Sequence, residues 1–427
     1  MNSPLSRQHF KNPIAVPLRR GPIAALDVGT SKVACLIGEH MADGNGEGTA
    51  AKLRISGSGH QLSEGLVAGQ VVDMRAAEDA IRSAVDAAER MAGMEVRNVV
   101  IGIAANQLVS QMAEAEVPLN GHAVTQEHMA LALRHAYEDF WSEDYEILHA
   151  IPIGYGIDNS HGIIDPRGMH GDVLKVTMHM MAAPAGPVRN LLTCIEQCHL
   201  QCEKLVATPF ASGLSTLMQD EIDLGVLHID MGGGTTSASV FYEGEVMFST
   251  VVPVGGRHIT TDIARGLNVS MTSAERIKTL YGSALATHGG EREQFEVPVL
   301  GGDHQMLPRT ELTKIIRPRL EETFELVNDA LTRSGLGHLA GRRVVLTGGG
   351  AQLNGAPEVA HTILEKQARI ATPMRLSGLP EAAAGPSFAA CAGLLTYAGR
   401  NHADAVLKED RAAGVMGWLG SWLRRNI

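Results

Sequence analysis

The sequence lacks any run of about 18 consecutive apolar residues, the length that a membrane-spanning helix needs, so we expect no segment that crosses a bilayer. Residues 1–20 carry basic side chains but no apolar core of signal-peptide length, and we expect them to form a flexible arm. Aromatic residues are scarce at 4%, whereas apolar residues make up 44% and charged residues 19%. This balance is typical of a soluble globular protein.

Positive charge is also in deficit: 36 Lys and Arg stand against 47 Asp and Glu, a net charge of −11. This argues against nucleic acid as a partner, and any contact with an anionic membrane must come from a local element. The five cysteines are an odd number, which favours a reducing cytoplasm over a disulfide framework. At 427 residues the chain is long for one core, so two or more domains are expected.

The stretch Val226–Gly244 carries the clearest local pattern. An apolar run ends in Asp230, three glycines and two threonines follow, and a second apolar run leads away. This predicts two strands joined by a tight turn. Successive N–H groups in a glycine turn suit phosphate oxygens, and an Asp at a strand end can hold Mg²⁺ through water. A plain glycine-rich hairpin with a surface Asp is the alternative.

The same pattern occurs earlier, in Pro22–Glu39, where an apolar run enters Asp27 and a polar glycine turn before a second apolar run. Each copy begins an alternation of strands and helices, which suggests two related halves that face each other. A third glycine turn follows the apolar run of Arg343–Gly355. A turn from strand to helix of this kind lets a flat ring or sugar lie against the backbone.

Two further elements stand out. Glu275 and Lys278 are three residues apart in a predicted helix, Thr272–Tyr281, and therefore share one face. A solvated helix surface is the alternative. Val96–Ala182 predicts a compact α+β insert.

The end of the chain predicts an amphipathic helix after a polar linker. Its apolar stripe and terminal cations are Val415, Trp418, Leu419, Trp422, Leu423, Arg424 and Arg425. A short helix with no internal partner favours binding at a membrane interface; docking onto the protein itself is the alternative.

In this order, the motifs resemble the nucleotide-binding fold shared by actin, DnaK-type chaperones and sugar kinases. Within that superfamily the chain resembles the bacterial cell-division family FtsA, from about Gly21 to Thr396. The resemblance rests on the insert with EILHAIPIGYGID and GIIDPRGMHGDVL, on VPVGGRHITTDIA, and on the terminal helix behind a linker.

The resemblance implies an α/β, actin-like (ribonuclease-H-like) ATPase fold of two lobes. The implied organisation is a flexible arm (1–20), a first lobe (21–95 and 183–222, closed by a helix at 386–398), an inserted FtsA-specific subdomain (96–182), a second lobe (223–256 and 336–385), a smaller subdomain of that lobe (257–335), a linker (399–413) and a membrane-targeting amphipathic helix (414–427).

It also implies that ATP and Mg²⁺ bind in the cleft between the lobes. The residues that match the phosphate segments are Asp27, Gly29, Thr30, Ser31, Lys32, Asp230, Gly232, Gly233, Gly234, Thr235 and Thr236. Those that match the adenosine segments are Glu275, Lys278, Gly348, Gly349, Gly350 and Ala351. Asp27 and Asp230 would organise Mg²⁺ through its waters.

One departure from the superfamily concerns catalysis. Actin-like ATPases place a Gln before the segment that matches Pro209–Gly213, and CEKLVATPFASG has none. Orienting water is a large part of phosphoryl-transfer catalysis, so we expect weak or no hydrolysis and assign no catalytic residue. Within the superfamily, a sugar kinase would need a catalytic carboxylate and a sugar pocket, and a chaperone would need a further substrate-binding domain. A pilus-assembly relative shares the fold and the insert.

The partners implied by the resemblance are the C-terminal tail of the tubulin-like protein FtsZ, other copies of the chain in an actin-like polymer, membrane lipids and later division proteins. The FtsZ tail would bind the smaller subdomain, at about Gly256–Gly335. The implied location is peripheral, on the cytoplasmic face of the inner membrane at the division septum.

Overall fold

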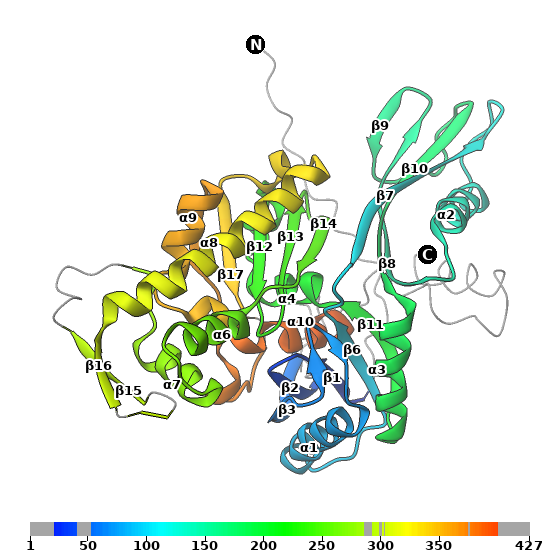
Figure 1. The fold of residues 1–427 in the computed structure, drawn as a ribbon. Helices are drawn as coiled ribbons and strands as arrows, with labels where there is room; N and C mark the ends of the chain where they lie inside the picture. The colour runs from blue at the N-terminus through cyan, green and yellow to red at the C-terminus, as the bar shows by residue number, and fades with distance from the viewer. Residues whose placement is uncertain are drawn as a thin grey trace.

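The structure is a computed structural model that describes residues 21–40, 53–285, 293–298, 301–302, 304–374 and 376–399. Two lobes lie side by side and an inserted subdomain projects from their junction (Figure 1). The predicted arm (1–20), all of the predicted linker (399–413) after Gly399, and the amphipathic helix (414–427), with all seven proposed membrane-binding residues, lie outside the described residues.

The first lobe is built on a five-stranded sheet of order β11-β6-β1-β2-β3. Its strands are β1 (Ile23–Val28), β2 (Lys32–His40), β3 (Leu53–Leu62), β6 (Asn98–Ile103) and β11 (Gln201–Ala207). The apolar run of β1 is almost wholly buried, as expected for a strand covered on both faces. Helices α1 (Met74–Ala92) and α3 (Ala185–Gln197) pack together on this lobe, and α4 (Thr208–Thr216) packs against α10 (Ala389–Gly399).

The N-terminal end of α1 shows why the chain turns into a helix there. The side chain of Asp73 accepts a hydrogen bond from the N–H of Ala76, and Gly93 ends the helix in the left-handed conformation. The short hairpin β4 (Leu66–Val67) and β5 (Gln70–Val71) precedes it. Alanines along the buried face of α1 let the helix approach β3 closely.

The second lobe repeats this arrangement with a sheet of order β14-β13-β12-β17-β18. Its strands are β12 (Val226–Met231), β13 (Thr236–Tyr242), β14 (Glu245–Val252), β17 (Arg343–Thr347) and β18 (Gln367–Ile370). In each lobe the first strand pairs antiparallel with the strand that follows it and parallel with a strand from later in the chain. The prediction of two related halves is therefore confirmed.

Helices and a small hairpin complete the second lobe. They are α5 (Gln219–Leu224), α6 (Gly256–Gly266), α7 (Met271–Tyr281), β15 (Gln294–Pro298), β16 (His304–Pro308), α8 (Arg309–Ser334), α9 (Ala356–Leu364) and the short 3₁₀ turns η1 (Gly337–Ala340), η2 (Gly349–Gln352), η3 (Glu381–Ala383) and η4 (Pro386–Phe388). Helix α8 packs against α6 and α9.

The insert has its own antiparallel sheet, of order β7-β10-β8-β9, and its own core. It contains β7 (Val109–Pro118), α2 (Gln126–Phe140), β8 (Tyr145–Ile157), β9 (Ser160–Ile163) and β10 (Val173–Pro184). The expected start at residue 96 is wrong, because β6 pairs in parallel with β1 of the first lobe. A buried apolar run predicts a strand but not the sheet that the strand joins.

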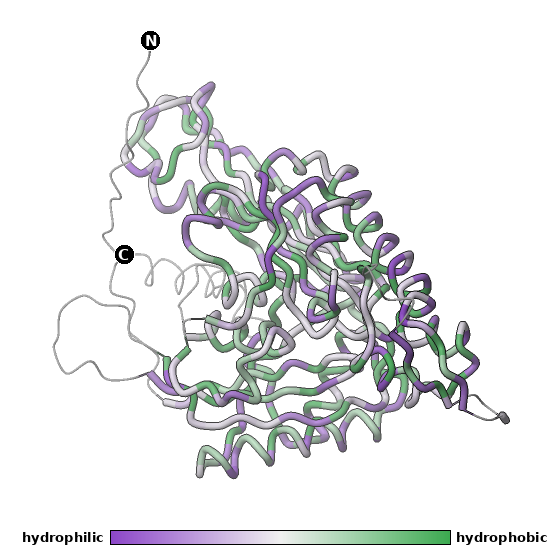
Figure 2. The backbone as a smooth tube through the Cα atoms, turned by 90° about the vertical axis from the view of Figure 1, so that its left-hand side faces the viewer, coloured by the Kyte–Doolittle hydropathy of each residue, from purple (hydrophilic) through white to green (hydrophobic). Residues whose placement is uncertain are grey.

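Hydrophobic and hydrophilic residues alternate along the helices on the outside of the molecule (Figure 2). In the part of the chain that the structure describes, no helix combines the length and the apolar character needed to cross a membrane.

Candidate functional site

The two Asp-glycine turns predicted from the sequence are tight hairpins. In the first, Gly29 N–H donates to the carbonyl of Lys32 at 3.0 Å; in the second, Gly232 N–H donates to the carbonyl of Thr235 at 2.9 Å. The strands on either side pair antiparallel, so Asp27 and Asp230 each lie one residue before the end of a central strand. Each lobe therefore presents the same structural unit to the other.

The turns touch each other across the gap between the lobes. A Cβ atom at Gly234 would lie 2.5 Å from Thr30 Oγ1, and one at Gly233 would lie 1.7 Å from Ser31 Oγ. Neither space can hold a methyl group without movement. Glycine is needed at these positions because another backbone segment lies close, as well as for the shape of the turn.

A small cavity of about 180 Å³ lies between the turns. Its charged lining residues are Asp27, Asp230 and Lys32. Burial raises the pKa of Asp27 to about 6 and that of Asp230 to about 7, and the Asp27 charge adds to the second shift. Two half-buried carboxylates that repel each other fit a divalent cation, because Mg²⁺ prefers oxygen ligands. Its charge would offset both the desolvation of the carboxylates and their mutual repulsion.

Lys32 supplies the cationic group of this cavity. Burial lowers the pKa of its ammonium, and the charges of Asp27, Cys391 and Asp230 act in the opposite direction. The Nζ atom donates a hydrogen bond to the carbonyl of Ser387 at 2.7 Å. Sequence reasoning missed Ser387 because it lies 355 residues from Lys32 and belongs to no local motif.

A larger open cleft of about 1420 Å³ borders the first cavity, and the two share Thr30, Ser31, Gly232, Gly233 and Gly349 as lining residues. Its walls come from α6, α7 and the third glycine turn, and they include Glu275, Lys278 and Gly350. The cleft also exposes Arg257, Arg276, Arg309 and Asn354, which sequence reasoning did not select.

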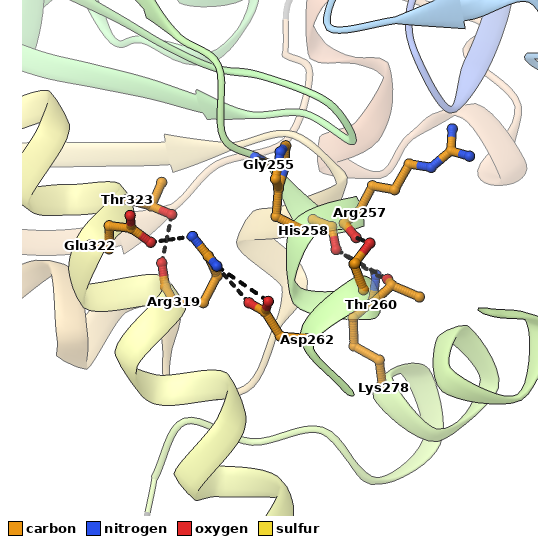
Figure 3. Close-up of polar contacts among 11 residues, drawn as sticks. Gly255, Arg257, His258, Thr260, Asp262, Lys278, Arg319, Glu322 and Thr323 are labelled. Atoms are coloured by element: carbon orange, nitrogen blue, oxygen red, sulfur yellow. Dashed lines mark hydrogen bonds and ion pairs between the residues drawn. The ribbon is translucent and has the colours of Figure 1, made fainter. Parts of the chain in front are cut away.

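Lys278 joins α7 to α6 at this wall (Figure 3). Its Nζ donates to Glu275 Oε2 at 2.8 Å, to Thr260 Oγ1 at 2.9 Å and to the carbonyl of Gly256 at 3.2 Å. Burial raises the pKa of Glu275, but hydrogen bonds from Lys278 and Thr260 outweigh it and leave that pKa lowered. The pair is thus part of a polar network that fixes the cleft wall.

The third glycine turn packs directly on the second Asp. Gly348 has φ +84°, and a Cβ there would lie 2.3 Å from Asp230 Oδ1. The turn continues as η2, and the helix α9 begins only at Ala356. Adenosine-type and phosphate-type segments are therefore contiguous in space, although more than a hundred residues separate them in the sequence.

All but two of the predicted nucleotide-binding residues line one of the two cavities. The exceptions are Thr236 and Ala351, both 0% exposed. Thr236 begins β13 inside the sheet, and Ala351 packs in the core beneath the turn, so neither lines these cavities, and their part in nucleotide binding stays a prediction. At the junction of β11 and α4, the lining residue is Thr208, whose Oγ1 donates to the carbonyl of Ile103 at 3.2 Å.

Family models match two parts of the chain. Residues 227–393 match the family described as "Cell division protein FtsA", and residues 105–182 match "SHS2 domain inserted in FTSA". The second match coincides with the β7–β10 insert and begins after β6.

Related proteins extend the match to most of the chain. The cell division protein FtsA of Agrobacterium fabrum is 42% identical over 399 residues, which cover 91% of this chain and 90% of that protein. FtsA of Escherichia coli is 32% identical over 418 residues, which cover 95% of this chain and 98% of that protein.

Solved structures agree on the fold. The PilM–PilN complex of type IV pilus biogenesis matches with a TM-score of 0.63 at 19% identity, covering 90% of this chain and all of that one. MreB5 of Spiroplasma citri bound to ADP matches with a TM-score of 0.50 at 16% identity, covering 88% and 95%. The predicted actin-like fold with an FtsA-type insert is confirmed, and the chain belongs to the FtsA family of cell division proteins.

Proposed function

We propose that the protein binds ATP with Mg²⁺ in the cleft between its lobes. The observation that carries this proposal is the meeting of two Asp-glycine turns over one cavity lined by two half-buried carboxylates and an ammonium. The large cleft beside it offers room for a nucleoside. The MreB5 structure with the same fold contains ADP.

Each group has a distinct part in this binding. Asp27 and Asp230 would hold Mg²⁺ through water, and the metal would supply charge that neutralises phosphate oxygens. Lys32 would contact the phosphates as a point charge. Backbone N–H groups of the turns 29–32 and 232–235 would surround them. Glu275, Lys278, Gly349 and Gly350 would border the adenosine.

We expect weak or no ATP hydrolysis. At the β11–α4 junction the cavity is lined by Thr208, whose hydroxyl is already engaged with a carbonyl. Such a group is a poor means of orienting an attacking water. ATP then acts chiefly as a ligand that sets the conformation or promotes polymerisation.

Titration of the purified full chain with a fluorescent ATP analogue tests the proposal. The wild type should bind in the presence of Mg²⁺, and Asp230→Asn should bind more weakly and gain little from added Mg²⁺. Asp220→Asn, at an exposed position of α5, is the matched control. If the wild type binds no nucleotide with Mg²⁺ present, the proposal fails.

As a member of the FtsA family, the protein acts in cell division, and we propose the finer role that the sequence suggests. Residues 414–427 would bind the cytoplasmic face of the inner membrane at the septum. Residues 257–335 would receive the C-terminal tail of FtsZ, so that the chain tethers the FtsZ ring, polymerises and helps to recruit later division proteins. The family membership and the apolar stripe of the last residues support this role.

A further inference from the structure

The turn η4, Pro386–Phe388, touches both lobes at the cleft. On the side of the second lobe, the carbonyl of Pro386 accepts from Gly348 N–H at 3.1 Å and from Thr347 Oγ1 at 3.3 Å. On the side of the first lobe, the carbonyl of Ser387 accepts from Lys32 Nζ at 2.7 Å. The turn thus links the adenosine-type segment to the lysine of the phosphate-type segment.

Phe388 adds a second contact to the same lysine. Lys32 Nζ lies 3.2 Å from the centroid of the Phe388 ring, over its face. The ring is 4% exposed, and the His60 ring lies edge-on to it at a centroid distance of 5.5 Å. A ring fixed in this way attracts a cation through its electron-rich face, so the ammonium is held between a carbonyl and an aromatic ring.

These contacts determine where the ammonium group of Lys32 lies in the cavity. Among the residues that the structure describes, Lys32 forms no ion pair with Asp27 or Asp230, although all three line the same cavity. The ring face uses none of the three N–H donors of the ammonium and the carbonyl uses one. Two donors remain for phosphate oxygens, and neither carboxylate is paired with the ammonium, so both can face a cation.

We propose that Ser387 and Phe388 position Lys32: they keep its ammonium aimed at the phosphate site and away from the two carboxylates. Phe388 is then a positioning residue for nucleotide binding. This inference rests on the proposed binding of ATP with Mg²⁺. Without the ring, the ammonium moves toward the carboxylates and competes with the metal.

The test is Phe388→Leu, a substitution that keeps an apolar side chain of similar size. Binding of a fluorescent ATP analogue to the full chain is titrated at several Mg²⁺ concentrations. Loss of a cation–π contact should weaken binding by about 3-fold to about 30-fold at low Mg²⁺. Because Lys32 now competes with the metal, the Mg²⁺ concentration for half-maximal binding should rise. Phe388→Tyr, which keeps a ring face, should restore wild-type binding.

Tyr397→Leu is the matched control, since Tyr397 is another buried aromatic residue of the α10 region with a lysine, Lys204, near its ring, and it does not line the cavity. Thermal unfolding of each variant reports on folding. The inference is overturned if Phe388→Leu binds as tightly as the wild type, or loses affinity equally at every Mg²⁺ concentration. A wild type that binds no nucleotide would instead overturn the proposed function.

Discussion

Gly234 illustrates how a single missing side chain lets two lobes meet. The space that its Cβ would occupy is already held by Oγ1, Cβ and Cγ2 of Thr30, all within 2.8 Å. Thr30 is 8% exposed, and its Oγ1 accepts from the N–H of Gly69. A branched side chain held in this way has no free rotamer to which it can retreat.

We predict that Gly234→Ala pushes the two turns apart and weakens nucleotide binding by at least about 10-fold, which corresponds to the roughly 1–3 kcal/mol that overpacking costs. The measurement is the same fluorescence titration. Gly154→Ala is the matched control, because a Cβ there would meet nothing within 4 Å. Equal affinity of the Gly234 variant and the wild type would contradict the close contact.

His179 joins the insert to the second lobe and should make stability depend on pH. It is fully buried on β10, and its Nε2 lies 2.8 Å from Ser110 Oγ, which accepts from Ser249 N–H of β14 at 2.9 Å. Burial lowers the pKa of His179 from 6.5 to about 4, and the neighbouring His149 acts in the same direction.

The direction of the pH dependence of stability follows from this lowered pKa. Between pH 6.5 and 4 the unfolded chain binds a proton at this residue that the folded chain does not. The contribution of neutral His179 to the free energy of unfolding is therefore complete above pH 6.5 and is lost as the pH falls toward 4. The free energy of unfolding is lower by about 2 kcal/mol at pH 5. Urea unfolding at pH 7.5 and pH 5 measures how far the free energy of unfolding falls between these pH values. The fall should be smaller for His179→Gln than for the wild type. Exposed His161→Gln should keep the wild-type drop.

At the scale of elements, the three glycine turns could be predicted because each directly follows an apolar strand, and the first two also precede another apolar run. That pattern is local and survives folding unchanged. Ser387 and Phe388 could not be predicted, since their role depends on contacts with Lys32 across more than 350 residues. Ala351 shows the opposite case: it continues a glycine motif, yet the 3₁₀ turn directs it into the core. The sheet that β6 joins could not be predicted either, because strand pairing depends on contacts between segments far apart in the sequence.

Helices α6 and α7 form one wall of the cleft through Thr260. Its hydroxyl donates to Glu275 Oε2 at 2.5 Å, has the carbonyl of Gly256 as a second acceptor at 3.1 Å, and accepts from Lys278 Nζ at 2.9 Å. We predict that Thr260→Val leaves this network incomplete, because an isosteric methyl can neither donate nor accept. Binding of the ATP analogue should weaken by about 3-fold to about 10-fold. Thr261→Val, at the next position of α6, which does not line the cleft, should bind like the wild type.

At the scale of the whole molecule, each lobe has its own sheet, but the larger hydrophobic core extends from the first lobe to Val226, Phe241 and Val345 of the second. The membrane role belongs to this scale as well, because it joins an acidic body to a small apolar stripe. Two Trp and two Leu, partly buried in an interface, give weak and reversible binding for one chain, and a polymer would raise it by avidity.

We predict that Trp418→Glu combined with Trp422→Glu abolishes co-sedimentation of the full chain with anionic liposomes and leaves ATP binding intact. The measurement compares pelleted fractions with and without ATP. Deletion of 414–427 should give the same result. Sedimentation of the double variant at the wild-type level would refute the proposed membrane helix.

We also predict a steady-state ATPase rate below about 1 s⁻¹, the low end for ordinary kinases, measured by phosphate release with Mg²⁺ and with or without liposomes. A faster rate would show that another group orients the water.

The course of α10 has a mechanical consequence for a chain held at a lipid surface. The helix begins beside Lys32 and the cleft, and at its other end Gly399 lies against Leu53 and His40, at the far end of the first-lobe sheet. The fourteen residues 400–413 that follow can reach at most about 50 Å. A membrane anchor after these residues would restrain the first lobe directly. The second lobe would be held only through the first and could rotate about the cleft. A change in the cleft would then move the second lobe, with the proposed partner-binding residues 257–335, relative to the anchor.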